Sequence, residues 1–421
     1  MKKITLSLAG LLAAAALVPD ASALPVFARQ TGMACRACHF QHFPLLNSFG
    51  RAFKASGYTL MGAQSKVEDE HLSIPVNLNL GVLTTTGYET QSNRGVGIPN
   101  GSYNFPADGG ELSLFFGGRV SDNVGFLSEL ALTGTGVGPA NTNAAKLPIL
   151  FEVGGNGTRV GIVPMATAGQ GAAHSFELLN TGAAATHRMA AVAGPGGEHI
   201  NTNSAAQYLG TKTAANGFSF VAVNPNYGFL NIGTYGISAA AIGGPLASGG
   251  TNGMNSTYVR LASLFEVGGW DSAVGIQDFS GKDVTNLIDT KATIIDAQMQ
   301  GEAGGKPLGL YASYGRAPST VATNMFNAGT LTRKSFNMAA ELGVIPHKAT
   351  VQLAFRRGNS GAPFVAGASD TDNAIMLGGT YELAQNVELS LTHTSQSGGA
   401  WDVVPEPPGK SATSFMLEAL F

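Results

Sequence analysis

Residues 349–356 read Ala349-Thr350-Val351-Gln352-Leu353-Ala354-Phe355-Arg356. Apolar side chains at positions 349, 351, 353 and 355 alternate with polar ones at positions 350, 352 and 356. This period of two is typical of a β-strand, in which successive side chains point to opposite faces. A strand with one apolar and one polar face fits between lipid and a wet lumen. A soluble sandwich also alternates, with its apolar face inward, so the pattern by itself leaves both folds open.

The same alternation recurs from about residue 72 to the end of the chain. It is seen in residues 74–82, 124–132 and 387–392. The last residues repeat it with an aromatic side chain at the end, in Thr413, Phe415, Leu417, Ala419 and Phe421. This ending resembles the C-terminal strand of outer-membrane barrels.

The segments between the alternating stretches are sorted by length. Tight turns are expected at 121–123, 155–157, 215–216, 268–270, 303–305, 345–347 and 385–386. Longer polar stretches are expected at 84–109, 135–147, 166–205, 225–255, 281–288, 317–332, 358–372 and 397–410. Short turns on one side and long loops on the other are typical of outer-membrane barrels, whereas a sandwich has no reason to sort its loops in this way. We therefore predict an all-β fold, a transmembrane barrel of about 16 antiparallel strands with both chain ends on the short-turn side.

The composition agrees with this fold and excludes others. Charged residues are 12% of the 421 residues, about half the ~25% of a soluble domain. Apart from residues 4–18, no stretch approaches the ~20 apolar residues of a spanning helix, and the mean hydropathy is only +0.11. A net charge of −3 gives no basic footprint for a nucleic acid, so no nucleic-acid partner is expected. Phosphate-loop, zinc-protease and serine-hydrolase motifs are absent from the sequence, and no catalytic residue is predicted.

Residues 1–23 have the form of a secretory signal peptide. Lys2 and Lys3 precede an apolar run over residues 4–18, and Ala21-Ser22-Ala23 supplies the cleavage pattern. Export through a bacterial inner membrane is therefore expected, with cleavage after Ala23. We divide the remaining chain into a short helical segment, residues 24–70, and the barrel, residues 71–421.

The two cysteines of the chain lie together in Cys35-Arg36-Ala37-Cys38-His39. This C-x-x-C-H pattern is typical of covalent haem c attachment. The two thiols add to the vinyl groups of the haem, and the adjacent histidine ligates the iron. The alternative is a C-x-x-C disulfide beside a histidine, in an oxidising compartment. Export, and a histidine in the required place, favour haem. We therefore predict one covalently bound haem c, held by Cys35, Cys38 and His39.

A helix is expected after the motif. Pro44 can begin it, Leu46, Phe49 and Phe53 recur at helical spacing and would cover the haem edge, and Gly57 fits its C-terminal cap. Arg51 and Lys54 lie three residues apart and are candidates to pair with the haem propionates. A solvated helix face is the alternative for these two cations.

The sixth iron ligand is left open by the sequence. His42 follows His39 by three residues and is expected to form a hydrogen bond near the haem. Met61 has the separation needed to loop back to the iron, and His71 is the other candidate. His174, His187 and His199 are expected to be exposed in one long external loop.

Residues 24–62 also carry a family resemblance. The run Leu24-Pro25-Val26-Phe27-Ala28-Arg29-Gln30-Thr31-Gly32, the C-x-x-C-H motif and the following Phe43-Pro44, Phe49-Gly50-Arg51, Phe53-Lys54 and Gly57-Tyr58-Thr59 resemble the start of outer-membrane monohaem cytochrome–porin fusions, the c-type cytochromes of extracellular iron oxidation. The resemblance covers about forty residues. It implies a conduit that passes electrons through one haem from an extracellular donor such as Fe(II) to a periplasmic c-type cytochrome. Whether such redox chemistry makes the protein an enzyme is left open.

Two other functions remain open at this point. The chain can be a solute porin whose haem-bearing segment is a plug or redox sensor. It can also pass electrons outward, to an external acceptor.

Overall fold

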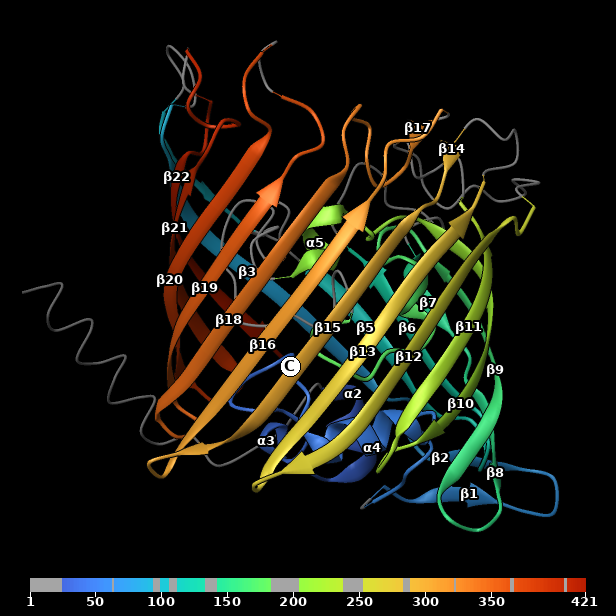
Figure 1. Cartoon of the computed structure of the whole chain (residues 1–421). Coiled ribbons are helices and arrows are strands. Elements are labelled where there is room, and N and C mark those ends of the chain that lie inside the picture. Colours follow the sequence, from blue (N-terminus) through green and yellow to red (C-terminus); the bar gives the residue numbers. More distant parts are fainter. Residues whose placement is uncertain are drawn as a thin grey trace, which may run out of the picture.

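A computed structural model describes residues 25–62, 64–93, 99–105, 112–132, 142–182, 204–237, 253–282, 288–321, 323–363, 367–404 and 407–421. The expected signal peptide lies outside these described residues. Short helices come first in the described chain, and a long series of strands follows. Figure 1 shows the strands as a tilted barrel and the first helices inside one end of it. Within the described residues, no helix has the length and apolar character needed to cross a membrane.

The N-terminal segment, residues 25–62, contains three helices: α2 (Pro25–Thr31), α3 (Cys35–Cys38) and α4 (Ser48–Ala55). The side chain of Asn47 accepts a hydrogen bond from the backbone N–H of Gly50, which makes Asn47 the N-cap of α4. The helix therefore begins at Ser48 and not, as expected, at Pro44. Gly57 follows its end in the left-handed conformation (φ 73°), as the sequence predicted.

A small hairpin connects this segment to the barrel. It consists of β1 (Lys66–Glu68) and β2 (Ser73–Pro75), which form a sheet of their own. The first barrel strand begins only at Leu80 and runs to Gln91. The polar residues 84–91, expected in a loop, thus belong to this strand, because threonine side chains suit a strand as well as a loop.

The barrel is a closed antiparallel sheet. Its strands are β3 (Leu80–Gln91), β4 (Gly101–Asn104), β5 (Leu112–Arg119), β6 (Gly125–Ala131), β7 (Thr142–Lys146), β8 (Ile149–Val153), β9 (Thr158–Thr167), β10 (Ala215–Asn224), β11 (Gly228–Gly236), β12 (Ser256–Val267), β13 (Trp270–Gly281), β15 (Ala292–Ala303), β16 (Lys306–Ala317), β18 (Arg333–Ile345), β19 (Ala349–Asn359), β20 (Thr371–Ala384), β21 (Val387–Ser397) and β22 (Ser411–Leu420). The short strands β14 (Ile288–Asp289) and β17 (Thr323–Asn324) pair with each other outside the barrel sheet.

The number of barrel strands confirms the prediction. β4 and β5 pair with different parts of β3, and β7 and β8 pair with different parts of β9, so each of these two pairs is one interrupted strand. The barrel therefore has 16 antiparallel strands. β22 pairs with β3 and closes it, and the backbones of Val82 and Phe421 exchange two hydrogen bonds at this seam.

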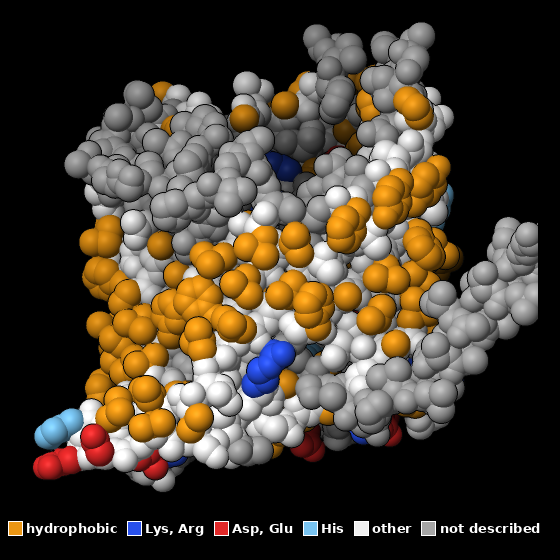
Figure 2. All heavy atoms as spheres, turned by 180° about the vertical axis from the view of Figure 1, so that it is seen from behind, with side chains coloured by type: hydrophobic (Ala, Val, Ile, Leu, Met, Phe, Trp, Pro, Cys, Tyr) orange, Lys and Arg blue, Asp and Glu red, His pale blue; other side chains and the backbone are white. Residues whose placement is uncertain are grey.

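The two faces of the strands are reversed relative to a soluble protein. On β19, the apolar Val351, Leu353 and Phe355 are 46%, 53% and 39% exposed, whereas the polar Gln352 and Arg356 are buried. Figure 2 shows hydrophobic side chains spread over the outer wall and carboxylates at its lower edge. Apolar side chains therefore face outward to lipid and polar ones face the lumen, which excludes a sandwich. Closed barrels of this kind lie in the bacterial outer membrane, with their short turns on the periplasmic side.

Short and long connections lie at opposite ends of the barrel, as expected, but one short turn lies at other residues than predicted. Seven short turns join the strands at one end, and the longer connections join them at the other end (Figure 1). The turn expected at Ala215 and Asn216 is wrong, because these residues begin β10, which runs to Asn224. The turn lies instead at residues 225–227, where Pro225 cannot donate a hydrogen bond to the ladder.

The connection between β9 and β10 folds into the lumen. Its described part contains the short helices η1 (Ala172–His174) and α5 (Ala205–Leu209). Phe176, Leu178 and Leu179 are at most 2% exposed and pack against inward-facing residues of β10 and β11. The lumen thus contains the N-terminal segment at its periplasmic end and this inward loop, residues 168–182, further inside.

Candidate functional site

Helix α3 presents the C-x-x-C-H motif as one helical turn. The backbone N–H of His39 donates to the carbonyl of Cys35 at 2.9 Å, and both cysteines are free, half-buried thiols. Burial raises the pKa of each thiol to about 11. The side-chain amide of Asn47 donates to the carbonyl of Ala37 at 3.1 Å, and this ties the turn to the start of α4.

Gly50 allows α4 to pack directly on the motif. A Cβ atom at this position would overlap the carbonyl oxygen of Cys38. The clash is with backbone atoms, which have little freedom to move. The close approach of α4 to the motif therefore requires glycine at position 50.

Backbone carbonyl groups orient the ring of His39. Its Nδ1 atom lies 3.2 Å from the carbonyl oxygen of Leu45, and its side chain is buried. Burial lowers the pKa of His39 to about 4, so the imidazole is neutral at pH 7. A neutral ring whose Nδ1–H donates to a carbonyl offers its Nε2 lone pair to a metal, and such a bond fixes ring orientation and raises ligand basicity.

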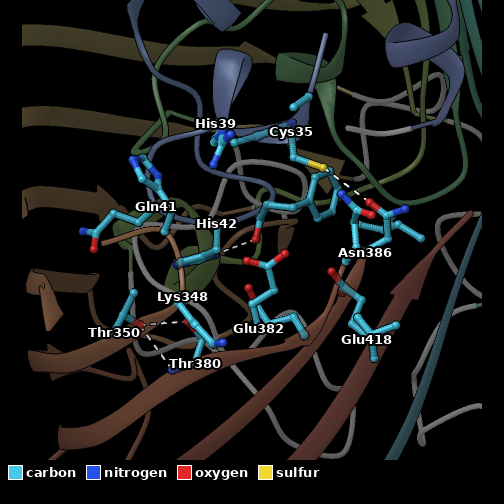
Figure 3. A pocket seen from close by; sticks show the side chains of 18 residues that line it. Cys35, His39, Gln41, His42, Lys348, Thr350, Thr380, Glu382, Asn386 and Glu418 are labelled. Carbon is cyan, nitrogen blue, oxygen red and sulfur yellow. Dashed lines mark hydrogen bonds between the residues drawn. The ribbon is translucent and has the colours of Figure 1, made fainter. Parts of the chain in front are cut away.

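A cavity of about 200 Å³ separates the motif from the barrel wall (Figure 3). The N-terminal segment forms one side of it, with Cys35 and His39. The other side comes from the periplasmic ends of four strands and their turns, and its polar members are His347, Lys348, Thr350, Thr380, Glu382, Gln385, Asn386, Glu388 and Glu418. Both sides meet at one point of the lining, where the thiol of Cys35 donates to Oδ1 of Asn386 at 3.7 Å.

The donor set fits a haem attached at the motif. Two free thiols one turn apart and a neutral imidazole with its Nδ1 atom bonded to a carbonyl are the groups that haem c requires. The cavity is smaller than the ~300–1,000 Å³ of sites that enclose a drug-sized ligand, so the chain would cover only part of such a group.

His42 connects the N-terminal segment to the barrel wall. Its Nδ1 atom lies 2.6 Å from the carbonyl oxygen of Phe43, and its Nε2 atom lies 2.7 Å from Oε2 of Glu341 on β18. Burial opposes the charge on His42, but the carboxylates of Glu341 and Glu388, together with the hydrogen bonds of the ring, outweigh it and raise the pKa of His42 to about 9. His42 is therefore protonated, with both ring nitrogens engaged.

Arg51 and Lys54 lie away from the cavity that the motif lines. Arg51 is buried and pairs with Asp271 on β13, and it also donates to Gln300 on β15 at 3.4 Å. Burial lowers the pKa of Lys54 to about 7, although Glu177 of the inward loop opposes this shift. The structure thus directs both cations toward the lumen wall and loop.

The aromatic face expected on α4 is divided. Phe53 is buried and packs edge-on against Phe27, with ring centroids 5.0 Å apart, whereas Phe49 is 38% exposed. Leu46 precedes the helix and forms a β-bridge with His39. The expectation that these three side chains form one helical face was wrong, because the Asn47 cap starts the helix too late to include Leu46.

The two candidate sixth ligands also lie outside the cavity lining. Met61 is half-buried and precedes Gly62, whose backbone N–H donates to the carbonyl of Gln30 on α2. His71 is exposed in the turn between β1 and β2, where its backbone N–H donates to Asp69. Figure 1 shows this hairpin at the lower right, with α4 between it and α3 in the view.

Sequence reasoning missed the barrel's contribution to the cavity. His347 lies in a turn that the sequence predicted, but nothing in the local pattern showed that this turn lies opposite the motif. Only the closure of the barrel around the N-terminal segment brings residues 34–43 and 347–350 together.

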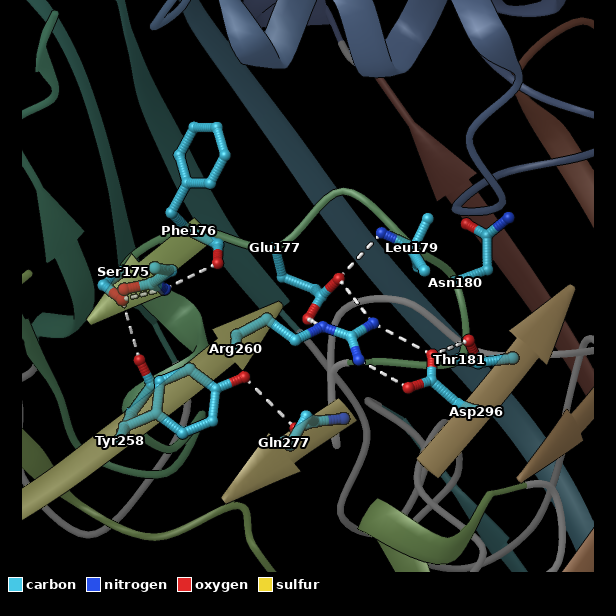
Figure 4. A network of polar contacts seen from close by, with 12 residues as sticks. Ser175, Phe176, Glu177, Leu179, Asn180, Thr181, Tyr258, Arg260, Gln277 and Asp296 are labelled. Atoms are coloured by element: carbon cyan, nitrogen blue, oxygen red, sulfur yellow. Dashed lines mark hydrogen bonds and ion pairs between the residues drawn. The ribbon is translucent and has the colours of Figure 1, made fainter. Parts of the chain in front are cut away.

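A second polar cluster fixes the inward loop (Figure 4). Arg260 on β12 is fully buried, and its guanidinium pairs with Glu177 of the loop (2.9 Å) and with Asp296 on β15 (2.5 Å). Thr181 of the loop donates to the same aspartate. This charge pairing fixes the loop to the wall of the lumen.

The inward loop also contacts the N-terminal segment. The side chain of Asn180 accepts from the backbone N–H of Leu46 at 2.8 Å and donates to its carbonyl at 3.1 Å. His174, expected in an exposed external loop, is buried, because the loop folds inward. His187 and His199 lie outside the described residues. Among the described residues, no group of three or more histidine, cysteine or acidic side chains is placed to hold a metal ion.

No protein-family model matches the chain, and no curated protein matches it. Solved structures that are similar to it include OmpT, an outer-membrane protein of Vibrio cholerae, in its trimer form (10% identity, TM-score 0.46, 82% of this chain and 98% of that chain). A substituted variant of the Rh. blastica porin is also similar (14% identity, TM-score 0.46, 82% of this chain and 100% of that chain). A protein from work on the asymmetric conductivity of engineered proteins matches with the same identity, coverage and score.

Proposed function

We propose that this chain is an outer-membrane electron-transfer protein in which Cys35 and Cys38 attach one haem c and His39 ligates its iron. The observation that carries the proposal is the location of the motif, a pair of free thiols and an oriented neutral imidazole inside the end of a membrane-spanning barrel. A haem bound in this way supplies reversible one-electron transfer.

The chain's own residues would fix the position of this site within the barrel. The His42–Glu341 pair and the Arg51–Asp271 pair connect the N-terminal segment to the lumen wall. Gln30 adds a third connection, since its side chain accepts from the backbone N–H of Arg119 on β5 at 2.9 Å. A rigidly placed donor set is what a fixed electron-transfer route between two carriers needs.

The position of the motif relative to the two sides of the membrane indicates which partners we propose. The short turns, the motif and the cavity lie at the periplasmic end, where a soluble c-type cytochrome or another electron carrier can approach. The donor, which we propose to be Fe(II), would act from the extracellular side. Each Fe(II) oxidised to Fe(III) outside releases one electron, and that electron reduces one ferric carrier inside. Outer-membrane lipid would contact the apolar outer wall.

A solute porin with a plugged lumen is the second candidate. The lumen wall is polar, with buried Gln352, Asn337 and Arg260, and the fold is a porin-like barrel. On this interpretation the N-terminal segment and the inward loop are a plug, and the contacts described above hold the plug in place.

Detection of a covalent haem, and of its reduction by Fe(II), would distinguish the electron-transfer protein from the solute porin. The mature protein would be purified from outer membranes, stained for haem on a denaturing gel, and mixed with Fe(II) while its absorption spectrum is recorded. We expect one covalent haem, which Fe(II) reduces. A Cys35→Ala/Cys38→Ala variant should fold as a barrel without haem, and His71→Ala, an exposed control, should retain it. A folded wild-type barrel that lacks haem and conducts small solutes in planar bilayers would support the porin instead.

A further inference from the structure

The cavity beside the motif contains a second histidine that comes from the barrel and not from the N-terminal segment. His347 lies in the turn between β18 and β19 and lines the same cavity as His39. The two imidazoles belong to the two sides of the cavity, one to the motif and one to the barrel wall. A group attached at Cys35 and Cys38 would therefore lie between a segment that carries one histidine and a turn that carries another.

The third histidine that lines the cavity, His42, and the lysine that lines it, Lys348, make contacts elsewhere. Both ring nitrogens of His42 are engaged, with the Phe43 carbonyl and with Glu341. The ammonium of Lys348 lies over the ring of Tyr381, 5.7 Å from its centroid. In contrast, the imidazole of His347 is exposed and forms no hydrogen bond with any residue that the structure describes.

The backbone holds His347 in a defined place. Its φ angle is 57°, in the left-handed region that non-glycine residues seldom adopt. The N–H of Lys348 donates to the carbonyl of Ile345 and closes the turn at 3.0 Å, and the carbonyl of Lys348 accepts from Glu382 on β20 at 2.8 Å. A positive φ is common in tight hairpin turns, and here it fixes the backbone from which the His347 side chain extends.

We propose that His347 would be a second protein ligand of the haem iron, supplied by the barrel wall to a haem that the N-terminal segment holds. The inference rests on the proposed function, since it requires the haem at Cys35 and Cys38. Two histidine ligands give a lower reduction potential than a histidine–methionine pair. Ligation would also connect the N-terminal segment to β18 and β19 through the iron.

The spin state of the ferric haem tests this proposal. Absorption and electron paramagnetic resonance spectra would be recorded for the purified holoprotein and for His347→Ala, Met61→Ala and His71→Ala. We expect a low-spin wild type, a high-spin His347→Ala protein that added imidazole returns to low spin, and low-spin spectra for the other two variants. Haem staining on each sample verifies that the haem is still attached.

Other outcomes separate the two proposals. A low-spin His347→Ala protein, or loss of the low-spin state in Met61→Ala or His71→Ala, would overturn the role of His347. A wild-type haem that is already high-spin would also overturn the role of His347, but it would leave the proposal of a covalent haem intact. A wild type without covalent haem would overturn both.

Discussion

The Nε2 atom of His42 lies 2.7 Å from Oε2 of Glu341, so an ion pair joins the segment that carries the C-x-x-C-H motif to barrel strand β18. The side chains are 3% and 0% exposed, and Gln352 on β19 donates to the same carboxylate oxygen at 2.7 Å. Breaking a buried pair by removing one partner costs about 3–5 kcal/mol, because the other charge is left unpaired. Loss of this pair should therefore weaken the attachment of the N-terminal segment to the barrel wall.

The first prediction concerns Glu341→Ala. We expect residues 25–62 to become accessible to protease while the barrel stays folded, because the charge on His42 loses its partner. Limited proteolysis with detection of the released N-terminal fragment measures this. A double variant, His42→Ala/Glu341→Ala, should be less accessible than Glu341→Ala, because neither charge remains. Equal protection of Glu341→Ala and wild type would show that the pair does not hold the segment.

The His42–Glu341 pair also predicts that the attachment of the N-terminal segment to the barrel depends on pH. Despite the opposing effect of burial, Glu341 and then Glu388 raise the pKa of His42 from 6.5 to about 9. Because the pKa of His42 is higher when the N-terminal segment is bound to the barrel than when it is released, protonation of His42 stabilises the bound state. This stabilisation is complete below pH 6.5 and is lost as the pH rises through about 9. We expect the protease accessibility of residues 25–62 to increase between pH 7 and pH 10. In Glu341→Gln this rise should be smaller, and a wild-type profile that is flat over this range would contradict the assignment.

The third prediction concerns the contact between α4 and the motif. Gly50→Ala places a methyl group against the carbonyl oxygen of Cys38, so α4 must move away from α3. Overpacking of this kind costs about 1–3 kcal/mol. We expect less holoprotein at equal barrel yield, measured by haem stain relative to total protein. Gly169→Ala is the matched control, because a Cβ there contacts nothing within 4 Å. Equal loss of haem in both variants would argue against a specific clash.

The fourth prediction concerns the inward loop. Arg260→Ala leaves Glu177 and Asp296 without their shared cation, so residues 168–182 should detach from the lumen wall. We expect higher single-channel conductance in planar bilayers than for wild type. Arg357→Ala, which removes an outward-facing arginine, is the control and should leave the conductance unchanged. Unchanged conductance in Arg260→Ala would show that the loop keeps its place without this pairing.

Much of the fold could be predicted from the sequence, because its signals are local. Alternation along a strand, as in residues 349–356, shows its two faces directly, and turn and loop lengths give the number of strands and the side on which the chain ends lie. The errors also have local causes. The residues Ala215 and Asn216 fit a turn as well as a strand end, and Thr84, Thr85 and Thr86 suit a loop as well as a strand.

The candidate site was only half predictable. Cys35, Cys38 and His39 lie within a stretch of five residues, so their arrangement follows from one helical turn. The partners of Arg51 and His42 are Asp271 and Glu341, which lie more than two hundred residues away along the chain. Such contacts depend on how the barrel closes around the N-terminal segment, and a single sequence does not specify that.

Electron transfer across a sealed membrane tests the central proposal most directly. The holoprotein would be inserted in liposomes that contain ferric cytochrome c, and Fe(II) held by a chelator that cannot cross lipid would be added outside. We predict that trapped cytochrome is reduced, one equivalent for each Fe(II) oxidised, with wild type but not with Cys35→Ala/Cys38→Ala. Reduction that is equally fast with both proteins, or no reduction with a wild type that carries haem, would contradict the proposed function.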